Sequence, residues 1–235
     1  MANDNIQAEF KKKLLGDLWH EYQTAYGYGN EVITPEEKQV SEFDMSWFLK
    51  AHKLGIVQPK TKIVRPSDRC RYSTLRDEGS VAYFGHKKKD HNPRKLYVSL
   101  EPIIIVGAIA RLHCDHNWQK TQLALKSEAW AFDAVAFEGQ YRGSEYLLCE
   151  VKKTTGETDK LCELMHGYLQ SGKVDENGLG GKEINALRKV ISLRESPAKV
   201  LWAVGPDRYE KIFKIDRSEG KIELKEADKT ALNGP

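Results

Sequence analysis

Asp133, Glu150 and Lys152 are two carboxylates and an amine whose spacing could bring them together. They lie in the segment AWAFDAVAFEGQYRGSEYLLCEVKKT, which covers residues 129–154. The pattern predicts two strands joined by a short turn, with Asp133 inside the first strand and Glu150 and Lys152 near the end of the second. Because side chains alternate along a strand, Glu150 and Lys152 share one face. Antiparallel pairing of the two strands brings Asp133 onto that face as well. We therefore expect two carboxylates and one amine to converge on one site.

This trio of side chains suits a hydrated divalent cation. Two neighbouring carboxylates repel each other unless a cation lies between them, and hard oxygen ligands favour Mg²⁺, with Mn²⁺ as a substitute. Such an ion keeps several waters and leaves room for a phosphate oxygen. Lys152 could then orient or deprotonate a water and neutralise charge that develops on phosphorus. This chemistry is that of phosphodiester hydrolysis.

Asp133, followed after 16 intervening residues by Glu150-Val151-Lys152, resembles the D…ExK signature of the PD-(D/E)XK nuclease superfamily. The resemblance implies an α/β protein with a restriction-endonuclease-like αβββαβ core and a mixed central sheet, here over residues 101–204. It implies that Asp133 and Glu150 bind the metal ion and that the Val151 carbonyl can be a further ligand. It also implies that Lys152 is the catalytic lysine.

The same family often adds a glutamate from the first core helix, and two residues compete for that place. Glu101 stands at the start of the predicted helix. Glu128 has the wrong parity to share a face with Asp133 on a regular strand, so it would need a bulge or a bend. No proline precedes Asp133, which departs from the family pattern.

Hydrophobic periodicity predicts the elements of this core. The apolar run from residue 103 to 110 indicates a helix over residues 102–115 that is buried on most sides, with a buried strand as the alternative. Strands are predicted at residues 121–126, 130–137, 145–153 and 199–204, helices at 158–171 and 182–193, and a closing hairpin at 209–215 and 221–224. Ile184, Leu187, Val190 and Ile191 are expected on the inward face of the second of those helices.

The first hundred residues have a different pattern. A helix is predicted over residues 5–26, and a second helix begins at the capping box of Thr34 and Glu37 and ends near Leu54. Strand-like pieces follow at residues 62–64, 81–86 and 95–100. We therefore expect an accessory region at 1–100, with two helices and a β-hairpin, and a catalytic core at 101–235. The accessory region is either a winged-helix-like or other binding module, or peripheral decoration.

A net charge of +3 conceals a basic segment between Lys60 and Lys95. This segment holds eleven basic and four acidic residues, a local charge of +7, with aromatic residues interleaved. Such a patch fits a phosphate backbone, although a solvated hairpin is the alternative. The candidate nucleic-acid-binding residues are Lys60, Lys62, Arg65, Arg69, Arg71, Lys87, Lys88, Lys89, Arg94 and Lys95.

Composition narrows the class of protein further. Of the 235 residues, 40% are hydrophobic and 30% are charged, which favours a soluble globular chain. The longest apolar run is too short to cross a bilayer, and the first residues do not form a secretory signal. Four scattered cysteines favour a reducing, cytoplasmic compartment.

The combined expectation is a Mg²⁺-dependent endonuclease that acts on DNA. Two alternatives remain: a non-catalytic nucleic-acid-binding regulator built on a nuclease-like core, and an RNA-processing nuclease. No membrane partner is expected, and the sequence leaves homodimer formation open.

Overall fold

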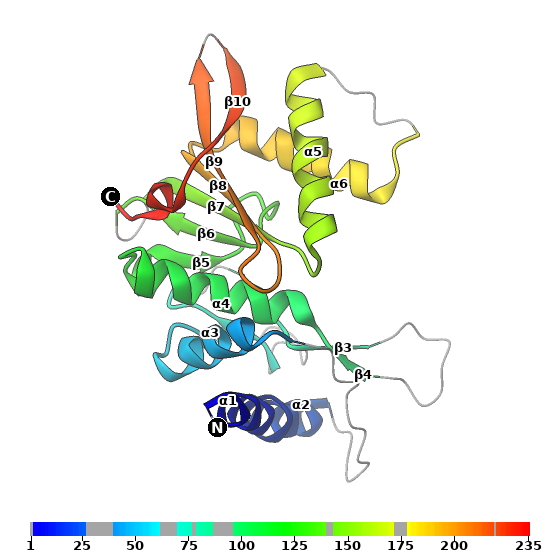
Figure 1. Cartoon of the computed structure of the whole chain (residues 1–235), viewed down its shortest axis with the longest axis vertical. Coiled ribbons are helices and arrows are strands. Elements are labelled where there is room, and N and C mark those ends of the chain that lie inside the picture. Colours follow the sequence, from blue (N-terminus) through cyan, green and yellow to red (C-terminus); the bar gives the residue numbers. More distant parts are fainter. Residues whose placement is uncertain are drawn as a thin grey trace.

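The computed structural model describes most of the chain as a mixed α/β protein (Figure 1). The described residues are 2–26, 40–61, 70–76, 79–86, 96–139, 143–171, 178–218 and 220–235. A six-stranded sheet lies at the centre, with helices on both of its faces. The predicted α/β class and the mixed central sheet are confirmed.

The central sheet has the strand order β10-β9-β8-β7-β6-β5. Neighbouring strands are antiparallel except β7 and β8, which run parallel. The strands are β5 (Leu123–Leu125), β6 (Ala134–Phe137), β7 (Glu145–Val151), β8 (Val200–Val204), β9 (Glu210–Ser218) and β10 (Lys221–Glu226). Every one of these strands was predicted, and β8 lies in the interior of the sheet because all five of its residues are buried and none is charged.

The start of β6 is the predicted strand boundary that differs most from the structure. Strand β6 begins at Ala134, whereas the sequence pattern predicted a start at residue 130. Trp130 has a left-handed backbone, with φ of 57°, and 71% of its surface is exposed. Its N–H donates to the Ser127 carbonyl at 2.8 Å, which closes a turn. A tight turn therefore occupies the residues before Asp133, and Asp133 directly precedes the strand.

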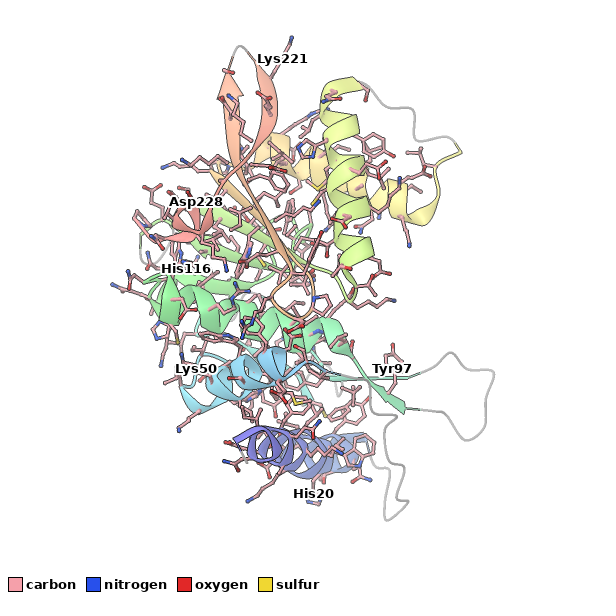
Figure 2. The ribbon with its side chains drawn as sticks, in the orientation of Figure 1. His20, Lys50, Tyr97, His116, Lys221 and Asp228 are labelled. Atoms are coloured by element: carbon pink, nitrogen blue, oxygen red, sulfur yellow. The ribbon has the colours of Figure 1, made fainter. Side chains whose placement is uncertain are left out.

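Strand alternation divides the core between the two faces of the sheet. Ala134 and Ala136 belong to a cluster of buried side chains that includes α4, while Val135 and Phe137 belong to a cluster that includes α5 and α6. Figure 2 shows side chains filling the space between these layers. The three helices are α4 (Leu100–Asp115), α5 (Thr155–Ser171) and α6 (Gly181–Glu195), and all three were predicted.

Helix α4 lies between the sheet and α3 (Glu42–Lys53). Its residues from Ile103 to Leu112 are all buried, as expected for a helix that is apolar on most sides. Gly107 allows the close approach of α3, because a Cβ there would lie 3.2 Å from the Trp47 Cβ. The strand alternative for this run is wrong.

The N-terminal helices agree with prediction in part. The predicted helix at 5–26 is confirmed as α1 (Ala2–Lys11), a π-helical segment (Lys12–Leu18) and α2 (Trp19–Tyr26). The predicted start of the second helix at Thr34 lies outside the described residues. A continuous helix from there is wrong, because Ser41 has an extended backbone and caps α3 by accepting a hydrogen bond from the Asp44 N–H at 3.1 Å.

Two short antiparallel pairs follow α3. Strands β3 (Phe84–His86) and β4 (Leu96–Val98) form the predicted hairpin pairing, and its turn at 87–95 lies outside the described residues. The strand predicted at 62–64 lies outside them too. Strands β1 (Gln58–Pro59) and β2 (Tyr72–Ser73) were not predicted, since two residues are too few for a periodic signal.

The predicted boundary near residue 100 falls between β4 and α4. Only Ser99 separates these two elements. One cluster of buried apolar side chains continues across the boundary, from Phe10 and Phe48 to Ile105 and Leu147. The division into an accessory region and a core stays a prediction. Among the described residues, no helix has the length and apolar character needed to cross a membrane.

Candidate active site

Asp133 lies at the entry to β6, beside the end of β7. Its N–H donates to the Cys149 carbonyl at 2.9 Å, and its own carbonyl accepts from the Lys126 N–H at 2.9 Å. These ladder bonds hold the Asp133 backbone between two strands although it is not in a strand itself. The prediction that Asp133 lies inside a strand is therefore wrong by one residue, because β6 begins at Ala134.

Both carboxylate oxygens of Asp133 have partners. Lys126 Nζ donates to Oδ1 at 2.6 Å, and the Val151 N–H donates to Oδ2 at 3.0 Å. The side chain of Asp133 is 17% exposed. The predicted meeting of Asp133 with the end of β7 is thus present, and it is made through the Val151 backbone.

Glu150 is the more deeply buried carboxylate, with 3% of its side chain exposed. Lys152 Nζ donates to Oε1 at 2.5 Å, and Lys189 Nζ from α6 donates to Oε2 at 2.7 Å. Lys189 also donates to the Ala131 carbonyl, which ties α6 to the turn before Asp133. As predicted, Glu150 and Lys152 share a face, and it is the face that α6 covers.

The charges of these groups are coupled. Burial raises the pKa of Asp133, but the charge and hydrogen bond of Lys126, together with the charge of Lys189 and the hydrogen bond from the Val151 N–H, hold that pKa below its usual value. Burial and then the charge of Asp133 raise the pKa of Glu150 despite Lys189 and Lys152. Burial disfavours the Lys152 ammonium, yet the Glu150 carboxylate raises the pKa of Lys152 overall, with smaller effects from Asp133 and Glu101. Each lysine therefore favours the ionised form of the carboxylate beside it, while burial and the charge of Asp133 disfavour ionised Glu150.

The two candidate third carboxylates lie in different places. Glu101, in the first turn of α4, lines the same pocket as Lys152. Glu128 is exposed, and its N–H donates at 2.8 Å to Glu145, the first residue of β7. Glu145 stands five residues before Glu150, about 16 Å along the strand. The structure thus brings Glu101 to the site and leaves Glu128 toward the other end of β7.

The site offers carboxylate and carbonyl oxygens, which are the ligand type that a hard divalent ion prefers. Mg²⁺ is commonly bound by one or two carboxylates and keeps several water ligands. Asp133, Glu150 and the Val151 carbonyl can supply the oxygen ligands from the protein. No group of three or more acidic, histidine or cysteine side chains in the described parts of the chain is arranged to hold a metal ion. The ammonium groups of Lys126 and Lys189 supply the positive charge that the carboxylates need.

Lys126 and Lys189 are the two site residues that sequence reasoning missed. Lys189 carried a detectable signal, because it stands among the buried residues Ala186, Val190 and Leu193 on the apolar face of α6. A lysine on such a face indicates a buried acidic partner. The expected inward residue Ile191 is instead 39% exposed, so that prediction is wrong.

Only two of the ten candidate nucleic-acid-binding residues are described. The Lys60 N–H donates to the Arg71 carbonyl at 2.8 Å, and the Arg71 guanidinium donates to Ser80 Oγ at 2.7 Å and to the Ser80 carbonyl at 2.6 Å. Lys62, Arg65, Arg69, Lys87, Lys88, Lys89, Arg94 and Lys95 lie outside the described residues. In the sequence, Arg94 and Lys95 directly precede β4, and only Ser99 separates β4 from α4, the helix that carries Glu101.

The chain matches no protein-family model, no curated protein and no solved structure with which it was compared. The fold therefore defines a mixed α/β protein, and any assignment of activity depends on the side chains at the end of β7.

Proposed function

We propose that this protein is a metal-dependent phosphodiesterase that hydrolyses DNA as an endonuclease. The observation that carries this proposal is the meeting of Asp133, Glu150 and Lys152 at one sheet end, beside a pocket that Glu101 also lines. Buried acids and amines that perturb one another's pKa values are typical of catalytic sites.

The arrangement of elements supports a restriction-endonuclease-like core. Helix α4 is followed by β5, β6 and β7, then by the helices α5 and α6, and then by β8 parallel to β7. This order corresponds to αβββαβ with one additional helix before the last strand. The acidic residues lie where β6 begins and β7 ends, so neighbouring strands position both of them.

Each side chain has a defined role in the proposed reaction. Asp133 and Glu150, with the Val151 carbonyl, would hold Mg²⁺ or Mn²⁺, which supplies Lewis-acid stabilisation of phosphate charge when bound. Lys152 orients the attacking water and neutralises charge that develops on the phosphate oxygens. Lys126 and Lys189 balance the carboxylates while no ion is present.

The proposed partner is DNA, held by the basic segment between Lys60 and Lys95, with RNA as an outcome that the cleavage assay separates. A cytoplasmic location is also proposed, because all four cysteines are free thiols and three of them are buried.

One observation favours a second candidate function. Both carboxylates are already paired with lysines, so the core is electrostatically satisfied without a metal ion. A nucleic-acid-binding regulator with a structural, nuclease-like core would have such a site. It would bind nucleic acid without metal and with strong dependence on salt.

Cleavage of a substrate panel tests the proposal. Wild-type protein is incubated with Mg²⁺ or Mn²⁺ and duplex, single-stranded, branched or modified DNA, or with RNA. We expect metal-dependent cleavage of DNA that Asp133→Asn and Lys152→Met abolish and that the exposed variant Glu223→Gln retains.

Thermal unfolding with added Mn²⁺ separates the two candidates. An enzyme is stabilised by the ion, by about 2.7 kcal/mol at one hundred times the dissociation constant, and this gain requires Asp133. Absence of both cleavage and metal stabilisation, together with salt-sensitive binding of DNA, would establish the regulator instead.

A further inference from the structure

A pocket lies between α5 and α6 and opens onto Lys152 and Glu101. Its volume is about 170 Å³, which is less than a whole drug-sized ligand needs and suits a single planar ring with its adjoining groups outside. Its position is contiguous with the proposed catalytic residues, so a substrate whose phosphate lies at Lys152 must place an adjoining group near this opening.

One wall of the pocket is apolar. Leu161 is buried and Leu164 is half-buried, and both belong to α5, one turn apart on the same helical face. Their side chains offer a surface on which a flat ring can pack. A nucleobase has such a ring face and a polar edge.

The opposite wall offers polar groups without partners. Lys182 and Asn185 from α6 are exposed, and within the described parts of the chain neither side chain makes a hydrogen bond or ion pair. An asparagine amide can both donate to and accept from a base edge. A lysine ammonium can contact a phosphate oxygen.

The pocket is lined by charged groups of both signs. Lys152, Lys160 and Lys182 line it against two acids, Glu101 and Glu157. Glu157 lies 3.8 Å from Lys153 outside the pocket, which offsets part of its charge. Lys152 is paired with Glu150 and Lys160 with Glu163, so Lys182 is the lining lysine that has no ion pair within the described parts of the chain and can meet a phosphate.

We propose that this pocket binds one unstacked nucleotide of the substrate, next to the phosphate that is cleaved. The base packs on Leu161 and Leu164, Asn185 contacts its edge, and Lys182 contacts the adjoining phosphate. This inference rests on the proposed function and adds the substrate class to it. A base that is stacked within a duplex must leave the stack to enter, so single-stranded DNA or a strand end is favoured over continuous duplex.

Binding without metal tests this proposal independently of cleavage. Fluorescence anisotropy in EDTA compares a labelled single-stranded oligonucleotide with a blunt duplex of equal length. We expect tighter binding of the single strand. Asn185→Ala and Lys182→Ala should each weaken it about threefold to tenfold, the effect of one hydrogen bond, and leave duplex binding unchanged. Lys221→Ala, at the tip of the β9–β10 hairpin (Figure 2), should change neither affinity.

The outcomes separate the two proposals. If wild-type protein binds single strand and duplex equally, or if the pocket variants bind the single strand as wild type does, the pocket assignment is overturned and the nuclease proposal stands. If wild-type protein binds no nucleic acid at low salt, both proposals fail. Because Lys182 and Asn185 are exposed, their variants are expected to fold, and an unchanged unfolding midpoint verifies it.

Discussion

Lys189 of α6 and Glu150 of β7 form an ion pair of 2.7 Å, with 4% and 3% of their side chains exposed. The pair links α6 to the sheet at the candidate active site. Removal of Lys189 leaves Glu150 buried with Lys152 as its remaining partner and takes away the donor to Glu150 Oε2 and to the Ala131 carbonyl, which is far more costly than loss of a surface pair.

Lys189→Met should therefore lower the free energy of unfolding by about 3 kcal/mol or more. Urea denaturation monitored by circular dichroism measures the change. Lys199→Met is the matched control, because Lys199 pairs with Glu138 at the exposed surface and should contribute less than about 1 kcal/mol. The double variant Lys189→Met/Glu150→Gln should recover part of the loss, and an equal or greater loss would contradict this account.

Trp130→Gly should leave stability unchanged or raise it by up to about 1 kcal/mol. The left-handed backbone at this position costs a non-glycine residue about 1–2 kcal/mol, and the exposed indole gains little from burial. Thermal unfolding measures the difference. Trp130→Ala keeps the backbone cost and should show no such gain. A clear loss in both variants would show that the indole has a structural partner, and a loss in the glycine variant alone would contradict the backbone account.

Gly79→Ala should destabilise the protein more than Gly220→Ala. Both glycines have positive φ, 78° and 75°, but a Cβ at Gly79 would lie 1.8 Å from the Leu125 carbonyl oxygen, while the space at Gly220 is open. We expect about 1 kcal/mol of loss at Gly220 and a clearly larger loss at Gly79, measured by chemical denaturation. Equal losses would mean that the contact with β5 relaxes without cost.

His52 should make folding stability depend on pH between about 6.5 and 4. Burial, with a smaller effect from Lys13, lowers the pKa of His52 from 6.5 to about 4. Between these values the unfolded chain binds the proton and the folded chain does not. Stability is therefore full above pH 6.5 and falls, by up to about 3 kcal/mol, as the pH drops toward 4.

The variant His52→Gln provides the comparison for this pH dependence. Glutamine can keep a hydrogen bond to the Tyr83 hydroxyl, which lies 3.0 Å from His52 Nε2, but it does not titrate. Urea titrations at several pH values should show a shallower fall for the variant than for wild type. Parallel curves would exclude His52 as the source.

The amino-acid sequence alone determined the central elements of the fold. Apolar runs with helical or alternating spacing identified α4, α5 and α6 and every strand of the central sheet, because each must bury one face or all of its surface. Alternation also placed Glu150 and Lys152 on one face. The helix cap at Ser41 was not predicted, because the capping box at Thr34 favoured an earlier helix start. The turn before Asp133 was not predicted either, because the apolar residues from Trp130 onward favoured a longer strand.

Only the tertiary structure determined which lysines pair with the two carboxylates of the candidate site. Lys126 and Lys189 reach Asp133 and Glu150 from positions 7 and 39 residues away in the chain, and local periodicity contains no information on such pairs. Tertiary structure likewise decided that Glu101 lies beside Lys152 and that Glu128 lies beside Glu145, toward the other end of β7. Sequence spacing thus specified which residues lie on which face, while the folded chain determined which charges meet there.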